Sequence, residues 1–324
     1  MSSPRTAPET GSPMSMQTSP AAASVADLRR GRLRLRGRQV SYVETGPEGA
    51  APWVVLLHGG GIDRGDWAWG RTMRHLAPRF RCFAPDMPGY GGSDGFGRAH
   101  GIADFGPWLG AVLDARGIDR AHLVGSSMGG GTALWLALDA PARVRSVTVV
   151  GSYGLARRAP LHPALHLYSL GPAGRFIALS AARSRLAARA ALMAVYADPR
   201  RVTPGLVEEM YQEAQRQAEL QTFRGFLQAE VGAASFRTCF LDRLPGLVPP
   251  LFVMHGRSDR MVPLRHAREA ARVAPEARLL EMDAGHWPMR EQPKIFDSAL
   301  DTFLTDVEAG RLRRAAPSRA PAAT

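Results

Sequence analysis

The sequence predicts an α/β protein with a mostly parallel eight-stranded sheet, helices on both faces and an inserted α-helical cap. Two observations lead to this fold class. Short, continuous apolar runs alternate with helical patterns through most of the chain, which is typical of parallel strands that are buried on both faces. The alternation stops between about residues 155 and 248, where nearly every segment favours helix, and it resumes afterwards.

Eight segments have the composition of strands. The first two, at 32–36 and 39–44, are expected to form an opening hairpin around Gly37. The run at 54–57 is apolar throughout, so it predicts a strand buried on both faces. The remaining strands are expected at 80–84, 122–124, 146–150, 251–254 and 277–281.

Helical patterns separate these strands and divide the chain into two parts. The core helices are expected at 67–76, 104–116, 132–140, 264–273 and 292–307. Within the break, the Ala/Arg-rich stretch 176–196 and the amphipathic stretch 204–217 also favour helix. We therefore predict a core made of residues 28–154 and 249–310, with a helical cap at 155–248.

Composition restricts the class of protein. A chain of 324 residues with 45% hydrophobic and 22% charged residues is ordinary for a soluble globular enzyme, and it can bury a sizeable core. The formal net charge of +12 suggests a nucleic-acid partner at first. The arginines, however, are scattered, and no basic face alternates with aromatic residues, so we predict no such partner.

The cysteines and the ends of the chain bear on its compartment. Cys82 and Cys239 are the only cysteines, which argues against a disulfide framework and for the cytoplasm. No run approaches the roughly 18 apolar residues that a membrane span needs. The Ser/Pro/Ala-rich residues 1–27 predict a disordered leader without the pattern of a secretory signal, and residues 311–324 predict a disordered tail.

Ser127 is the first candidate catalytic residue. It is the central serine of a Gly-x-Ser-x-Gly pattern, 125–129, which follows an apolar strand and precedes a helix that begins at Met128. A serine on such a sharp turn has a strained backbone and a hydroxyl that projects clear of the main chain. The five-residue pattern alone also fits an ordinary glycine-rich turn that carries a surface serine.

An acid and a histidine follow Ser127 in the order that nucleophilic serine chemistry requires. The hydroxyl needs a base to take its proton and an acid to orient that base. Asp259 and His286 come after consecutive strands, so both are expected at the carboxyl edge of the sheet, beside Ser127. Asp283 competes for the role of the acid, but it lies on the same loop as His286, three residues earlier.

The glycine run 59–61 directly follows a strand and supplies a candidate oxyanion site. Acyl transfer needs two converging N–H donors, one from the residue after the nucleophile and one from an earlier loop. Met128 and Gly60 are the expected donors. A phosphate-binding loop is the competing interpretation, but the run lacks both the Gly-x-Gly-x-x-Gly spacing and a Lys-Ser/Thr pair.

Five stretches together form a specific pattern: LHGGG (57–61), DMPGYGGSD (86–94), LVGSSMGG (123–130), HGRSDRMVP (255–263) and AGHW (284–287). Through them the chain resembles the α/β-hydrolase fold family over roughly residues 32–308. The resemblance implies Ser127 as nucleophile, Asp259 as acid and His286 as base, with Gly60 and Met128 as oxyanion donors. A serine nucleophile speaks against the dehalogenases and epoxide hydrolases of this fold, which use aspartate.

Within that family, SSMGG, GRSDRMVPL and GHW look most like the hydrolases that cleave carbon–carbon bonds in ring-fission products. Those enzymes usually have an asparagine where Ser126 stands, and a cap arginine for the substrate carboxylate where a rough alignment puts Met210. Arg216, Arg224 or Arg237 could replace that arginine. The departures favour a moderately hydrophobic carboxylic ester, thioester or lactone as substrate, with carbon–carbon cleavage of a vinylogous diketo acid as the alternative.

The substrate pocket is expected between the sheet edge and the cap. Trp287, Trp67, Met210 and Ser126 are its predicted substrate-binding residues. The predicted partner is a small ester-like molecule, with no cofactor and no metal ion, and the oligomeric state stays open, a homodimer being one option. Two further alternatives fit the same residues: a biosynthetic tailoring acyl transferase or cyclase, and a non-enzymatic ligand-binding protein that keeps the triad.

Overall fold

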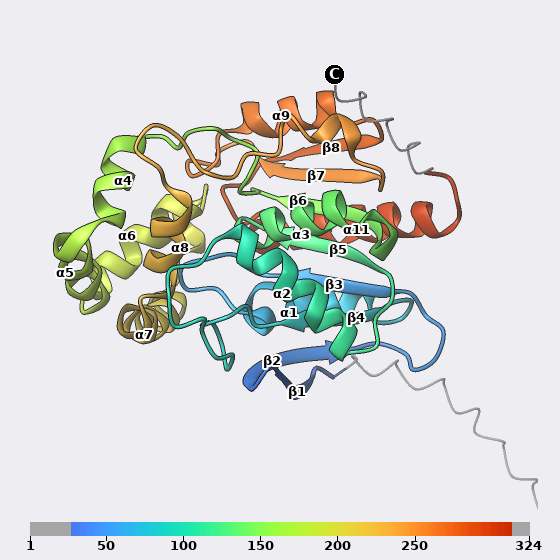
Figure 1. The fold of residues 1–324 in the computed structure, drawn as a ribbon, viewed down its shortest axis with the longest axis horizontal. Helices are drawn as coiled ribbons and strands as arrows, with labels where there is room; N and C mark the ends of the chain where they lie inside the picture. The colour runs from blue at the N-terminus through green and yellow to red at the C-terminus, as the bar shows by residue number, and fades with distance from the viewer. Residues whose placement is uncertain (1–26, 313–324) are drawn as a thin grey trace, which may run out of the picture.

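A computed structural model describes residues 27–312, so most of the predicted leader (1–27) and tail (311–324) lies outside the described residues. Its centre is an eight-stranded sheet in the order β1-β2-β4-β3-β5-β6-β7-β8 (Figure 1). The pairs β1–β2 and β2–β4 are antiparallel, and every other pair in the sheet is parallel. The predicted fold class, a mostly parallel eight-stranded sheet with helices on both faces, is confirmed.

The central strands are buried on both faces because their side chains alternate between two hydrophobic cores. In β3 (Trp53–Leu57), Val55 and Leu57 belong to one core, and Val54 and Leu56 belong to the other. This alternation is the two-residue period of a strand, which explains the continuous apolar run in the sequence. The other parallel strands are β4 (Arg81–Pro85), β5 (Ala121–Ser126), β6 (Val144–Val150), β7 (Leu251–Gly256) and β8 (Ala277–Met282).

Helices cover each face and enclose these two cores (Figure 1). On one face, the first core takes its helical residues chiefly from α2 (Ile102–Ala115), α3 (Met128–Asp139) and α9 (Leu264–Val273). On the other face, the second core includes residues of α1 (Gly65–Leu76), α10 (Pro288–Glu291) and α11 (Pro293–Glu308). The single-turn 3₁₀ helix η1 (Pro141–Arg143) leads into β6.

The opening hairpin is longer than the sequence predicts. β1 (Arg29–Leu35) begins three residues before the expected start at residue 32. It pairs along its whole length with β2 (Arg38–Thr45). The early residues are exposed arginines of an edge strand, so no apolar pattern marks where the strand begins. The turn takes two residues rather than Gly37 alone, because Arg36 and Gly37 both have positive φ, as tight hairpin turns require.

Between β6 and β7, the chain forms helices that lie beyond the carboxyl ends of the parallel strands (Figure 1). The helical stretch expected at 176–196 is divided in two, because the Ser184 hydroxyl caps a new helix by accepting the Ala187 N–H at 3.2 Å. These elements are α4 (His162–Ser169), α5 (Gly171–Ala182), α6 (Arg185–Val195), η2 (Pro199–Arg201), α7 (Pro204–Leu220), α8 (Thr222–Glu230) and η3 (Leu244–Gly246). Within residues 27–312, no helix has both the length and the apolar character that crossing a membrane requires.

Candidate active site

Ser127 lies on the sharp turn between β5 and α3, with φ 49° and ψ −116°. A side chain rarely adopts this backbone conformation, so the surrounding hydrogen bonds must hold it. The Ser127 N–H donates to the Val150 carbonyl at 2.8 Å, and the Ser127 carbonyl accepts the N–H of Gly130 and of Tyr153, each at 3.0 Å. The main chain of the candidate nucleophile is therefore fixed from both sides of the turn.

Two glycines let this turn form. A Cβ atom on Gly125 would lie 2.3 Å from the Gly129 carbonyl oxygen, and one on Gly129 would lie 2.4 Å from the Leu57 carbonyl oxygen. Real Cβ atoms essentially never approach backbone this closely, so only glycine fits at either position. The Gly-x-Ser-x-Gly pattern thus has a steric reason in this fold.

Asp259 and His286 form a buried, hydrogen-bonded pair. Asp259 Oδ2 lies 2.8 Å from His286 Nδ1, while Oδ1 accepts the N–H groups of Met261 and Val262 at 2.8 and 2.9 Å. Burial favours the protonated acid, but the charge and hydrogen bond of His286 outweigh it and hold the pKa of Asp259 below its usual value. Because a carboxylate can only accept, Nδ1 of His286 carries a proton, and Nε2 is the acceptor when the ring is neutral.

The competing acid, Asp283, lies elsewhere. Its carboxylate is at the surface and pairs with Arg257 at 3.3 Å. His255, on β7, lies close to the buried pair instead, with Nε2 at 3.4 Å from Asp259 Oδ2 and 2.8 Å from the Val262 carbonyl. Burial lowers the pKa of His255 below its usual value, which disfavours a positive charge on this ring.

A cavity of about 490 Å³ has both Ser127 and His286 in its wall, together with Met128. Aromatic rings from the cap line it: Phe223 and Phe226 of α8 and Phe236 beyond it. Such an apolar enclosure with a few polar groups is typical of a small-molecule site. Its other walls come from residues 152–165 and 260–263.

The four predicted substrate-binding residues do not line this cavity. Trp67 donates its indole N–H to Glu209 at 2.8 Å. Its ring packs edge-to-face against Trp287, with ring centroids 5.6 Å apart. Met210 borders a separate hollow of about 180 Å³ among the cap helices. Ser126 ends β5, fully buried, and its Oγ has no hydrogen-bond partner in the described residues.

The arginines in the cavity wall are not those considered from the sequence. Arg216 pairs with Glu213, Arg224 donates to the Gly171 carbonyl, and neither they nor Arg237 line the cavity. Arg158 and Arg260 do line it, and no Asp or Glu is among its lining residues. The cavity wall thus carries two cationic side chains from loops that the sequence pattern did not single out.

The glycine run lies against the serine turn, as the oxyanion hypothesis needs. A Cβ on Gly59 would lie 3.4 Å from Ser127 Cβ, and one on Gly60 would lie 3.6 Å from Met128 Sδ. Within residues 27–312, neither the Gly60 N–H nor the Met128 N–H has a hydrogen-bond partner. Met128 lines the cavity, whereas Gly60 does not.

Asp63 was not anticipated, and it fixes the shape of the glycine loop. Its buried carboxylate accepts the N–H groups of Gly59 and Arg64, each at 3.0 Å. Burial raises the pKa of Asp63 above its usual value. The sequence offers only a loop aspartate near a glycine run as a signal, which is too common to single it out.

Glu291 and Gly151 both lie against the loop that carries His286. Glu291 accepts the Gly285 N–H at 2.6 Å and the Ala197 N–H at 3.0 Å, which ties the cap to that loop. At Gly151, which has φ +50°, an added Cβ would lie 2.9 Å from His286 Nδ1 and 3.1 Å from Asp259 Oδ2. Neither role has a signal in the sequence, because each depends on segments that meet only in the fold.

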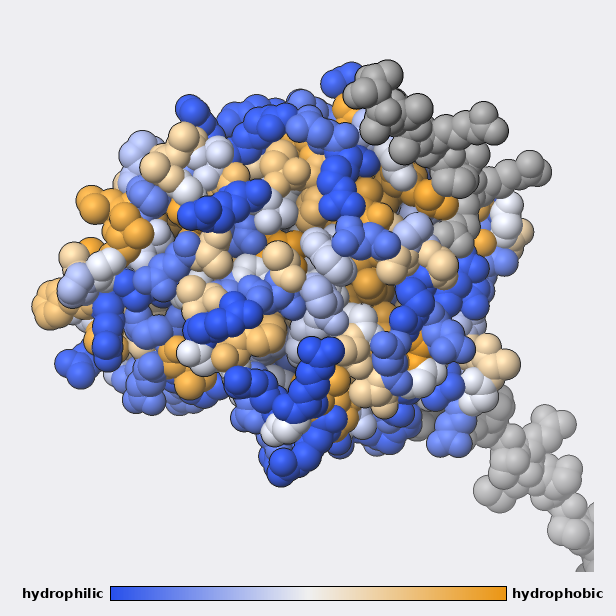
Figure 2. Space-filling view, in the orientation of Figure 1, coloured by the Kyte–Doolittle hydropathy of each residue, from blue (hydrophilic) through white to orange (hydrophobic). Residues whose placement is uncertain are grey.

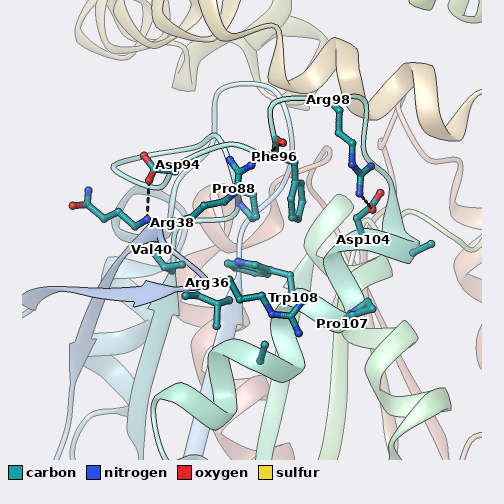
Figure 3. A pocket seen from close by; sticks show the side chains of 14 residues that line it. Arg36, Arg38, Val40, Pro88, Asp94, Phe96, Arg98, Asp104, Pro107 and Trp108 are labelled. Atoms are coloured by element: carbon teal, nitrogen blue, oxygen red, sulfur yellow. Dashed lines mark hydrogen bonds and ion pairs between the residues drawn. The ribbon is translucent and has the colours of Figure 1, made fainter.

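A second cavity, of about 430 Å³, lies away from these residues (Figure 3). It is enclosed by the β1–β2 hairpin, the loop after β4 and α2, with Trp108 and Phe96 among its walls. Arg98 already pairs with Asp104 there, at 2.5 Å. Neither Ser127 nor His286 borders it, so it is no part of the candidate active site.

Known proteins share this chain's sequence and fold. A family model described as alpha/beta hydrolase fold matches residues 52–293. A 2-hydroxy-6-oxo-6-phenylhexa-2,4-dienoate hydrolase of Comamonas testosteroni is 31% identical, over 82% of this chain and 91% of that protein. The acetyltransferase component of an acetoin cleaving system of Pseudomonas putida is 30% identical, over 83% of this chain and 67% of that protein.

Among solved structures, a meta-cleavage product hydrolase of Pseudomonas fluorescens superposes with a TM-score of 0.72. The match covers 85% of this chain and 97% of that chain, at 24% sequence identity. At this identity the likeness concerns the fold.

Proposed function

Because the chain belongs to the α/β-hydrolase fold family, we propose that it is a serine hydrolase that cleaves a carboxylic ester, thioester or lactone through an acyl-enzyme on Ser127. One observation carries the proposal. The Asp259–His286 pair and the strained Ser127 belong to separate segments, and Ser127 and His286 line one apolar cavity. No structural need of the sheet explains that combination, whereas acyl transfer requires it.

In this mechanism, Nε2 of His286 takes the proton from the Ser127 hydroxyl as the oxygen attacks the carbonyl carbon. The N–H groups of Gly60 and Met128 stabilise the oxyanion that forms. His286, now positively charged and oriented by Asp259, gives its proton to the leaving group. Water then repeats the steps on the acyl-enzyme, which releases the acid and restores Ser127.

Cleavage of a carbon–carbon bond in a vinylogous diketo acid is the second candidate, and it has equal support from the relatives. One of them is named as a hydrolase of such a compound, 2-hydroxy-6-oxo-6-phenylhexa-2,4-dienoate. Arg158 and Arg260 are also in the cavity wall, and their guanidinium groups suit a substrate carboxylate. Met210 lacks a charge and does not line this cavity. The absence of an arginine at Met210 therefore no longer counts against this chemistry.

The first experiment tests the nucleophile. A fluorophosphonate probe should label the wild-type protein and Ser126→Ala, and it should leave Ser127→Ala unlabelled. Ser126 is the matched control, because it is the adjacent serine and its side chain is fully buried. For any substrate that is turned over, Ser127→Ala should lower kcat by on the order of 10³–10⁶-fold. Equal labelling of all three proteins would reject the acyl-enzyme.

The second experiment separates the two reactions. Turnover of p-nitrophenyl esters is compared with turnover of coloured ring-fission diketo acids, and the products are identified by mass spectrometry. Faster hydrolysis of the esters supports the first candidate, and preferential loss of the diketo acid colour supports the second. A cyclised or transferred acyl product would instead indicate a tailoring enzyme.

Cys82 and Cys239 are free, which fits the predicted cytoplasmic compartment.

A further inference from the structure

The cap exposes an unusual amount of apolar surface. Of the ten large apolar side chains that are exposed in residues 27–312, eight lie between Leu161 and Leu220. Leu161 and Leu186 have exposed fractions of 82% and 77%, and Phe176 has 72%. Scattered single residues of this kind are normal on a protein surface, but a concentration on one part of the molecule indicates an interaction site.

The same part of the chain, up to residue 197, is rich in arginine and has no acidic residue of its own. Residues 155–197 contain six arginines and no Asp or Glu. Two of the six pair outside the segment, Arg157 with Asp242 and Arg185 with Glu208. The other four have no ion pair within residues 27–312, namely Arg158, Arg175, Arg183 and Arg189.

We define the cap patch by its exposed apolar and unpaired basic side chains. Its residues lie on or directly beside α4, α5 and α6, where they are exposed, and α5 packs against both α4 and α6. Figure 2 shows orange residues interspersed with blue ones at the left edge of the molecule, where Figure 1 places α4 and α5. The patch comprises Leu161, Leu167, Leu170, Phe176, Ile177 and Leu186 with Arg158, Arg175, Arg183 and Arg189.

The cap patch borders the cavity that holds Ser127. Leu161 and Arg158 belong to both, and Met261, which is also exposed, is another wall residue. A molecule held at the patch would therefore lie beside the opening to the candidate active site.

The charge of the cap patch decides between two occupants. Docking against a second copy of the chain through the same face would bring arginines of both copies together, and like charges repel across an interface. A lipid surface with anionic headgroups neutralises them, while Leu, Phe and Ile side chains enter the boundary of the acyl chains. Arginine suits this boundary because its stem is apolar and its head stays in water.

We propose that the cap patch docks the protein on a lipid surface that carries anionic headgroups. The docking does not depend on the proposed hydrolase activity, because it uses side chains outside the Ser127–His286–Asp259 group. It would place the cavity opening at the lipid surface, where hydrophobic acyl substrates concentrate.

Vesicle sedimentation with the full-length protein tests this proposal. Vesicles of phosphatidylcholine mixed with an equal part of phosphatidylglycerol should bind the protein, and pure phosphatidylcholine vesicles should bind it at least about tenfold more weakly. High salt should reduce binding to the mixed vesicles by a similar factor. Equal binding to both kinds of vesicle, or binding to neither, would overturn the proposal.

Paired variants locate the docking surface. Leu167→Ser/Phe176→Ser/Ile177→Ser should weaken binding to the mixed vesicles by about tenfold or more, whereas Ile295→Ser, an exposed apolar residue of α11, should not. Arg175→Gln/Arg183→Gln should also weaken binding, whereas the exposed Arg34→Gln on β1 should not.

Thermal unfolding midpoints, which do not depend on activity, show whether each variant is folded. Light scattering measures the oligomeric state and so tests the alternative, in which a second copy of the chain covers the cap patch. The proposal is wrong if two results occur together: the wild type is a dimer that the apolar triple variant disrupts, and the wild type does not bind the mixed vesicles. The cap patch is then a dimer interface.

Discussion

The carboxylate of Asp259 holds His286 with one oxygen and the backbone of its own loop with the other. Oδ2 lies 2.8 Å from His286 Nδ1, and Oδ1 accepts the N–H groups of Met261 and Val262. The loop bonds fix the orientation of the carboxylate independently of the histidine. In the proposed mechanism, this fixed carboxylate selects one tautomer of the imidazole and stabilises its cation.

Replacing Asp259 by Asn should lower kcat by on the order of 10³–10⁴-fold with little change in KM. The amide keeps the shape of the side chain, but it can offer an N–H to Nδ1, which favours the tautomer in which Nε2 cannot accept a proton. Steady-state kinetics on an accepted ester measure the effect. Asp283→Asn, at the exposed surface of the next loop, is the matched control and should retain wild-type kcat. If the two variants lose activity equally, Asp259 is not the orienting acid.

The lowered pKa of Asp259 also predicts how stability depends on pH. Because this pKa is lower in the folded protein than its ordinary value of 3.8, the folded state favours the carboxylate. The contribution to the free energy of unfolding is present above that ordinary value, and it is lost as pH falls through the lowered folded pKa.

Urea unfolding of the wild type and of Asp259→Asn, from about pH 6 down to about pH 3, checks this sign. The stability advantage of the wild type should shrink below about pH 4. An advantage that grows on acidification would contradict the prediction.

Gly151→Ala should damage catalysis more than folding. An added Cβ would press on His286 Nδ1 at 2.9 Å and on Asp259 Oδ2 at 3.1 Å. The substitution also strains the backbone, because Gly151 has φ +50°. Gly117→Ala separates the two effects, since Gly117 has φ +67° and nothing within 4 Å of an added Cβ.

Both glycine variants should lose about 1 kcal/mol or more of stability from backbone strain. Only Gly151→Ala should also lower kcat, by about tenfold or more, because displacement of the base disturbs its alignment. Chemical unfolding and steady-state kinetics measure the two effects separately. Equal kcat in the two variants would mean that the contact with His286 has no catalytic consequence.

Much of the fold could be predicted because strand alternation, glycine spacing and chain order are local signals. The eight strands and the placement of Ser127, Asp259 and His286 at strand ends follow from such patterns. The start of β1 could not be predicted, because its exposed arginines pair with β2 through backbone groups that leave no trace in the side-chain pattern.

The cavity walls were harder to predict, because they depend on which faces of distant segments meet. Trp67 and Trp287 look like pocket residues in the sequence, yet they pack on one another in the core on the α1 face. Conversely, Tyr153 and Arg158 line the cavity from the irregular segment between β6 and α4. No spacing rule connects them to Ser127.

Arg158 should favour substrates that carry a negative charge away from the scissile bond. Arg158 lies in the wall of a cavity that has no acidic lining residue, whereas its neighbour Arg157 is paired with Asp242 on the surface. For Arg158→Gln, kcat/KM on a p-nitrophenyl ester with a terminal carboxylate should fall by about threefold to tenfold. The effect is modest because Arg158 is exposed, so water and salt screen it.

The neutral p-nitrophenyl ester of similar length isolates the role of charge, and its kcat/KM should not change in Arg158→Gln. Arg157→Gln is the matched control, because it removes the adjacent guanidinium without altering the cavity wall, and it should leave both substrates unaffected. In the wild type, added salt should lower the preference for the anionic ester. A loss that is the same for both esters would show that Arg158 shapes the cavity rather than selecting charge.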